Sequence, residues 1–136
     1  MGRVAREAVI RMRYFIDSNI VIDYLRGYEP TIEALKSYLR GDNTLFISAI
    51  TNLEVHAGKS ITQLEVLENL EQFFSRATPV DITFEIAGIA GDFRRQYQTS
   101  VPDALIAASA YSLDALLITR NLKHFQPIKE IRVQSI

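Results

Sequence analysis

Cysteine is absent from this chain of 136 residues. Disulfides and thiolate metal sites are therefore excluded, so any metal ion must be held by oxygen or imidazole ligands. The chain also has no apolar run near the roughly 20 residues of a membrane helix, and its N-terminus has no long apolar core. We therefore expect no membrane contact, no signal peptide and a cytoplasmic location.

An excess of charge of one sign is missing too. The formal net charge is -1, so the chain lacks the strongly basic balance of proteins that bind nucleic acid by bulk electrostatics, although local patches remain open. With 48% hydrophobic residues and no Pro-, Gly- or Ser-rich tract, the composition predicts one globular domain. Because Met12 stands directly before the first predicted strand, we place that domain at residues 12–136. Residues 1–11 are an N-terminal extension, a tag remnant or a functional arm.

The first apolar run ends at a carboxylate. Residues 14–16 are followed by Asp17, Ser18 and Asn19, and then by apolar residues at helical spacing (Ile20, Val21, Tyr24 and Leu25). This pattern predicts a buried strand that ends at Asp17 and turns into a helix. Ligand crevices form at the carboxyl ends of strands in open α/β sheets, so Asp17 is a site candidate. The alternative is that Asp17 or Ser18 only caps the helix.

The rest of the chain repeats this alternation of strands and helices. Periodicity predicts helices over 31–40, 62–74, 83–97 and 104–111, and one after Ser48 with Ile50, Leu53 and Ala57 on its apolar stripe. It predicts buried strands over 45–47 and 115–119, a last strand over 131–133, and at most a brief edge strand over 78–80. The predicted fold is α/β, a three-layer α/β/α sandwich with a mainly parallel central sheet.

Three further oxygen-bearing side chains accompany Asp17. Glu54 lies beside the apolar stripe of its helix, Asp103 opens the most apolar helix, and Asn121 follows the strand over 115–119. Parallel strands would let all four face one crevice, within reach of one cation. Two alternatives are that Glu54 tilts out to water and that Asp103 only complements the helix dipole.

This group of side chains has a definite chemistry. Carboxylate and amide oxygens without cysteine are ligands for Mg²⁺ or Mn²⁺, and crowded carboxylates repel one another unless a cation neutralises them. A cation that retains waters supplies a nucleophile and offsets charge on a phosphodiester. The pattern therefore favours phosphodiester hydrolysis.

Four segments resemble the motifs of PIN domains, in order and at the expected spacing. They are DSNIVIDYL at 17–25, SAITNLEVHAG at 48–58, PDALIAASA at 102–110 and LLITRNLKHF at 116–125. The nearest subgroup is the VapC-type toxins of toxin–antitoxin pairs. The resemblance implies an Mg²⁺- or Mn²⁺-dependent endoribonuclease that cuts structured RNA such as tRNA or rRNA. It also implies a small antitoxin partner and a homodimer or higher oligomer.

Carried over to this chain, the resemblance makes Asp17, Glu54 and Asp103 the metal-binding catalytic acids. Asn121 stands where many members have a fourth Asp, and this neutral amide favours one metal ion in the ground state, with a second arriving with RNA. Asn19 is expected to orient a carboxylate or a water, and Ser18 to take the helix cap.

Arg120 and Lys123 are candidates for phosphate contacts, with ordinary solvated charge as the alternative. We leave His56 and His124 out of the site. Two other functions remain open: a PIN-fold RNA- or protein-binding module with weak catalysis, which Asn121 favours, and an enzyme with an aspartyl nucleophile at Asp17. The second is disfavoured because Asn19 stands where a second Asp is needed.

Overall fold

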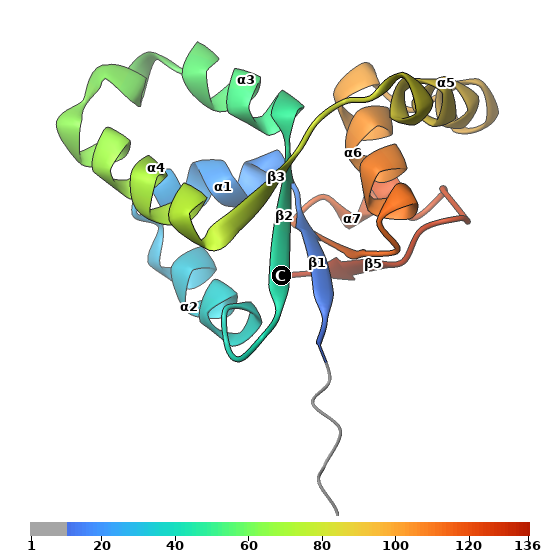
Figure 1. Ribbon diagram of the computed structural model, residues 1–136. Coiled ribbons are helices and arrows are strands. Elements are labelled where there is room, and N and C mark those ends of the chain that lie inside the picture. Colours follow the sequence, from blue (N-terminus) through green and yellow to red (C-terminus); the bar gives the residue numbers. More distant parts are fainter. Residues whose placement is uncertain (1–10) are drawn as a thin grey trace, which may run out of the picture.

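Five parallel strands form the central sheet of the computed structural model, which describes residues 11–136 (Figure 1). Their order is β3-β2-β1-β4-β5, and their bounds are β1 Arg13–Ile16, β2 Thr44–Ser48, β3 Ala77–Val80, β4 Leu116–Thr119 and β5 Val133–Ser135. The predicted parallel sheet is confirmed, and so is the edge position of β3. The predicted N-terminal extension lies, apart from Arg11, outside the described residues.

Helices cover both faces of this sheet (Figure 1). One side carries α1 (Ser18–Leu25), α2 (Glu29–Tyr38), α3 (Ala49–Ala57), the 3-10 helix η1 (Lys59–Thr62) and α4 (Leu64–Arg76). The other side carries α5 (Phe84–Tyr97), α6 (Val101–Ser112) and α7 (Leu122–Phe125). The predicted three-layer α/β/α sandwich is therefore confirmed. Within residues 11–136, no helix is both long and apolar enough to cross a membrane.

Alternation along the strands produces two separate cores. Phe15, Phe46 and Leu117 pack with α5, α6 and α7, whereas the neighbouring Ile16, Ile47 and Ile118 pack with α1 and α4. Successive side chains of a strand point to opposite faces, so continuous apolar runs are needed when both faces are covered. The strands of this chain have such runs.

Some element bounds differ from the prediction. The second helix begins at Glu29, because Pro30 fits the first turn of a helix and does not stop it. The last strand lies at Val133–Ser135, since Val133 pairs with Leu117 of β4. Helix α7 and the 3-10 helix η1 were not predicted, because four residues are too few to show a helical period.

Candidate active site

Asp17 lies at the carboxyl end of β1, in the middle of the sheet, and is 3% exposed. Its backbone N–H still donates to the Ile118 carbonyl (3.0 Å), and α1 begins one residue later. Its two carboxylate oxygens have different donors: Oδ1 accepts from the backbone N–H of Ser18 (2.8 Å) and Oδ2 from the hydroxyl of Thr119 (2.7 Å). The carboxylate is thus fixed from both sides.

The prediction that Ser18 caps α1 is wrong. Asp17 has the extended backbone of an N-cap residue (φ -67°, ψ 149°), and its side chain accepts the helical N–H. Ser18 is already helical, which turns its hydroxyl toward α3. Asp17 is therefore the cap and a site candidate at once, so the two predicted roles do not exclude each other.

Glu54 is joined to the first strand end through Ser18. The Ser18 hydroxyl donates to Glu54 Oε1 (2.9 Å) and lies 2.7 Å from the hydroxyl of Thr51. An ionised carboxylate only accepts, so the single proton of Ser18 goes to Glu54, and Thr51 donates to Ser18. This chain of hydrogen bonds holds α1 and α3 in register at the site.

The predicted apolar stripe of α3 is wrong in part. Leu53 is 61% exposed, whereas the buried residues of this helix are Thr51 and Val55. Glu54 is half-buried on the edge of that inward face. The polar Thr51 was overlooked as an inward residue because its burial depends on a hydrogen-bond partner in another helix, which periodicity does not reveal.

Asp103 lies in the first turn of α6, where its backbone N–H donates to the hydroxyl of the cap residue Ser100 (3.3 Å). Its Oδ2 is 3.3 Å from Nδ1 of His124 on α7. His124 was left out of the predicted site because a metal-bound water needs no separate histidine base, yet α7 places it against Asp103. His56 points outward, as expected, and contacts the Asn52 carbonyl.

Thr119 is a site residue that no sequence pattern predicted. It is fully buried at the end of β4. While its hydroxyl donates to Asp17, it accepts the backbone N–H of Asn121 (2.9 Å). Asn121 occupies the N-cap position of α7 without a capping hydrogen bond from its side chain. Thr119 therefore links the Asp17 carboxylate to the backbone of Asn121.

The negative charges of Asp103 and Glu54 act on the carboxyl group of Asp17. The pKa of Asp17 is raised above its ordinary value of 3.8, first by burial and then by the negative charges of Asp103 and Glu54, while the hydrogen bonds from Thr119 and Ser18 lower it. A nearby cation would relieve this repulsion, and oxygen ligands suit Mg²⁺ or Mn²⁺. The donor set therefore fits such an ion chemically.

The convergence of these side chains within one cation's reach stays a prediction. In the part of the chain from residue 11 onward, no group of three His, Cys, Asp or Glu side chains is placed to hold a metal ion. Each acid instead contacts a protein partner: Thr119 and Ser18 for Asp17, Ser18 for Glu54, and His124 for Asp103. Mutual repulsion of carboxylates favours this separation.

Arg120 lies against α1 and α2. Its Nε is 2.9 Å from Oδ2 of Asp23, a carboxylate with a 10% exposed side chain that also accepts from the Thr31 hydroxyl (2.8 Å). A phosphate bound by Arg120 would compete with this ion pair. Lys123 is exposed on α7, and within residues 11–136 Asn19 has no carboxylate partner. The predicted roles of these three residues stay predictions.

Replacing Arg120 with alanine is expected to lower the free energy of unfolding by about 1–3 kcal/mol. Breaking a buried ion pair costs about 3–5 kcal/mol, and the half-exposed Arg120 reduces that figure. Urea denaturation measures the effect. Arg132→Ala is the control, since its pair with Asp114 is exposed and should change the free energy by less than about 0.5 kcal/mol. Equal stabilities of the two variants would contradict a structural role for Arg120.

This parallel sheet with acids near its carboxyl edge defines an α/β/α sandwich protein with an acidic site, and comparison with known proteins identifies the family. The PIN domain model matches residues 14–130. The chain is 32% identical to ribonuclease VapC19 of Mycobacterium tuberculosis over 122 residues, 86% of this chain and 95% of that protein. It is 34% identical to ribonuclease VapC10 of the same organism over 123 residues, 86% of this chain and 89% of that protein.

Solved structures agree. VapBC-1 from nontypeable Haemophilus influenzae is 30% identical with a TM-score of 0.74, covering 91% of this chain and 98% of the matched one. A toxin–antitoxin complex from Klebsiella pneumoniae is 30% identical with a TM-score of 0.72, covering 87% and 94%. The chain belongs to the PIN domain family, and the resemblance to VapC-type proteins seen in its four motifs is confirmed.

Proposed function

We propose that this PIN-domain protein is a ribonuclease toxin of the VapC type, which hydrolyses phosphodiester bonds in structured RNA with Mg²⁺ or Mn²⁺. The main support for this chemistry is the environment of Asp17. Asp17 is buried at the strand end and lies in the field of Asp103 and Glu54. Burial first, and then these charges, raise its pKa, so a cation is favoured there. The names of the similar proteins, ribonuclease VapC, support RNA as the substrate.

Asp17, Glu54 and Asp103 would hold the ion, with Asn121 beside them. A divalent cation in this place would lower the pKa of a water and offset negative charge developing on the phosphodiester. The chain's own residues keep the acids in position: Thr119 and the Ser18 N–H fix Asp17, while the Ser18 hydroxyl fixes Glu54. Outer partners of this kind orient ligands and tune their basicity.

Cleavage of a structured RNA by the purified protein tests this proposal. We expect cleavage with Mg²⁺ or Mn²⁺, and none after treatment with a chelator. Mn²⁺ should also raise the melting temperature at neutral pH, since an ion that binds only the folded state stabilises it. Cleavage that persists in the chelator would contradict metal dependence. RNA binding without cleavage at any ion tested would favour the alternative, a PIN-fold binding module.

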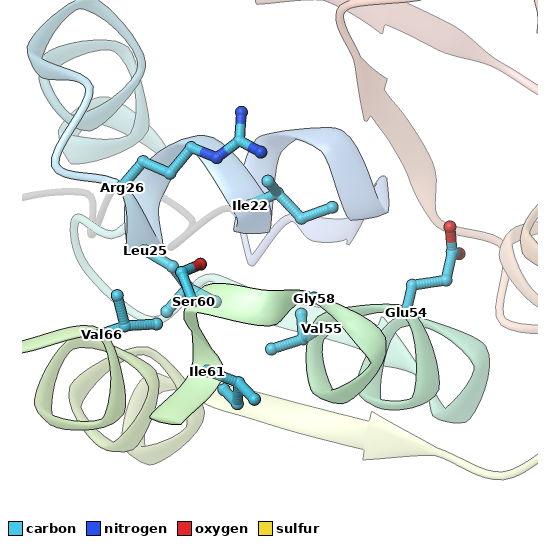
Figure 2. A pocket seen from close by; sticks show the side chains of 9 residues that line it. All are labelled: Ile22, Leu25, Arg26, Glu54, Val55, Gly58, Ser60, Ile61 and Val66. Atoms are coloured by element: carbon cyan, nitrogen blue, oxygen red, sulfur yellow. The ribbon is translucent and has the colours of Figure 1, made fainter. Parts of the chain in front are cut away.

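A pocket next to Glu54 supports a protein partner. Figure 2 shows the Glu54 carboxylate at one end of this pocket and Arg26, Ser60 and Val66 at the other, with Ile22 and Val55 between them. The pocket encloses about 90 Å³ and shares Leu25, Arg26 and Val66 with a neighbouring depression of about 570 Å³. An apolar segment of a small antitoxin would fit here and reach the acids.

The partner proposal has its own test. A short protein encoded beside this one should co-purify with the chain and suppress RNA cleavage. Binding that leaves Ile22 and Arg26 uncovered would contradict this pocket as the docking site. We also propose that the chain forms a homodimer. The nearly fully exposed Phe84 and the exposed Leu53 support this proposal, because a dimer interface would cover such apolar side chains. A monomer by light scattering at micromolar concentration would contradict it.

A further inference from the structure

A second groove reaches Asp103 on the side of the sheet opposite to the pocket at Glu54 (Figure 1). It lies between the C-terminal end of α5 and α7 and has a volume of about 340 Å³. Its volume falls in the lower part of the range of roughly 300–1,000 Å³ that is usual for ligand pockets. The pocket at Glu54 is lined mainly by aliphatic side chains, whereas this groove is lined mainly by polar ones, including Gln98, Ser100 and Lys123. The two depressions therefore suit ligands of different chemistry.

Two cations border this polar groove. Lys123 lies on its α7 wall with an exposed ammonium. Arg94 of α5 is exposed, and its Nε donates to the carbonyl of Thr99 (2.9 Å), a residue that lines the groove. In the described part of the chain, neither cation forms an ion pair with a carboxylate. Both charges remain available to an anionic ligand.

An aromatic ring forms part of the same wall. Tyr97 is half-buried, and its ring packs against Phe93 with centroids 6.3 Å apart. The Tyr97 hydroxyl donates to the Glu130 carboxylate, which holds the ring from its other end. A ring fixed in this way can stack with a flat ligand at little cost in side-chain entropy.

Gln98 adds an unusual backbone to this wall. It ends α5 in the left-handed conformation (φ 55°, ψ 36°), which is uncommon for any residue other than Gly, Asn and Asp. Its side chain is exposed and lines the groove. The side-chain amide of Gln98 can both donate and accept hydrogen bonds, so it adds a polar contact to the groove.

We propose that this groove binds a single-stranded stretch of the RNA substrate, directly beside the phosphodiester that is cut. A base stacks on Tyr97, Lys123 and Arg94 contact phosphates, and the Gln98 amide contacts a base edge. Cations, an aromatic platform and an amide are the groups that single-stranded RNA requires, whereas an apolar peptide segment would leave them unpaired. The proposal rests on the proposed ribonuclease function and assigns its substrate a path along the Asp103 side.

Fluorescence anisotropy with a short labelled single-stranded RNA of mixed sequence tests the groove. The measurement uses Asp17→Asn protein, so that the RNA is not cut. Adding Tyr97→Leu should weaken binding roughly 5- to 150-fold, the cost of losing one stacked base. Tyr97→Phe keeps the ring and should stay within about twofold. Adding Lys123→Gln should reduce the slope of log affinity against log salt by about 0.7, the value for one phosphate contact on a single strand.

Two further variants guard against a merely structural effect. Gln98→Gly relaxes the left-handed backbone, so it should fold at least as well as the parent while binding RNA more weakly. Lys36→Gln removes an equal charge from α2, where Lys36 pairs with Glu33, and should leave the affinity and the salt slope unchanged. A loss of affinity in Tyr97→Leu that Tyr97→Phe shares would point to the Glu130 contact and would overturn stacking.

The outcomes separate the two proposals. If the unmodified chain cleaves RNA, but Tyr97→Leu, Lys123→Gln and Gln98→Gly leave RNA binding by the Asp17→Asn protein unchanged, the groove is not the RNA path, although the ribonuclease function stands. If these variants lose the protein encoded beside the chain and keep RNA, the groove is a protein contact and the inference is overturned. If the parent neither binds nor cleaves RNA, the proposed function itself fails.

Discussion

Replacing Asp17 with asparagine is expected to reduce RNA cleavage on the order of 10³-fold. The change removes the charge of the most buried acid of the site, and with it several kcal/mol of cation-mediated stabilisation of the transition state. Each loss of about 1.36 kcal/mol lowers the rate tenfold. The geometry should survive, because an amide oxygen can still accept from the Ser18 N–H and the amide nitrogen can donate to Thr119. Single-turnover cleavage of a structured RNA measures the loss. Equal cleavage by both proteins would refute a catalytic role for Asp17.

The same variant should show a distinctive pH dependence of stability in metal-free buffer. The folded-state pKa of Asp17 is raised above 3.8, so the folded chain binds this proton more tightly than the unfolded chain. Stability from this group is therefore complete below pH 3.8 and is lost as the pH rises through the raised pKa. Asp17→Asn, which stays neutral, should gain stability relative to the parent over that window. Thermal unfolding at several pH values measures the difference in stability between the two proteins. If that difference does not change with pH, the expectation is wrong.

Leu117→Ala is expected to lower the free energy of unfolding by about 2–5 kcal/mol. Leu117 is fully buried in β4, where it packs with α5, α6 and α7, so alanine leaves a cavity in one of the two cores. Such a loss is a large part of the roughly 5–15 kcal/mol that stabilises a typical domain. Chemical denaturation measures it.

Leu64→Ala is the matched control for the core variant. Leu64 begins α4 and is 72% exposed, so the same truncation there should change the free energy by less than about 0.5 kcal/mol. Equal effects of the two leucine variants would contradict the assignment of Leu117 to a core. Both variants truncate leucine to alanine, so they differ only in how deeply the leucine is buried.

Local patterns in the sequence were sufficient for the fold class. The apolar runs 14–16, 45–47 and 115–119 are continuous because both faces of their strands are covered, and they correspond to β1, β2 and β4. Helical spacing likewise gave α4, α5 and α6 within a few residues. Bounds were missed where proline starts a helix, as in α2, or where an element is as short as α7.

The four motifs also identified the family, because their order and spacing are fixed along the chain. They named Asp17, Glu54, Asp103 and Asn121 as a group, and the structure places Asp17 in the field of Glu54 and Asp103. The motifs did not distinguish partners that are remote in sequence. Thr119 lies 102 positions from Asp17, and Glu54 lies 36 from Ser18, so neither contact has a local signature.

The sequence by itself thus determined most of the strands and the longer helices, since these follow from local periodicity, and it predicted which acids lie at one edge of the sheet. Only the tertiary structure decided which hydroxyl fixes which carboxylate, that Asp17 rather than Ser18 caps α1, and that Arg120 pairs with Asp23. The physical reason is that a buried polar group must find a partner wherever the packed helices and strands provide one. That partner depends on the three-dimensional arrangement, which a one-dimensional pattern does not contain.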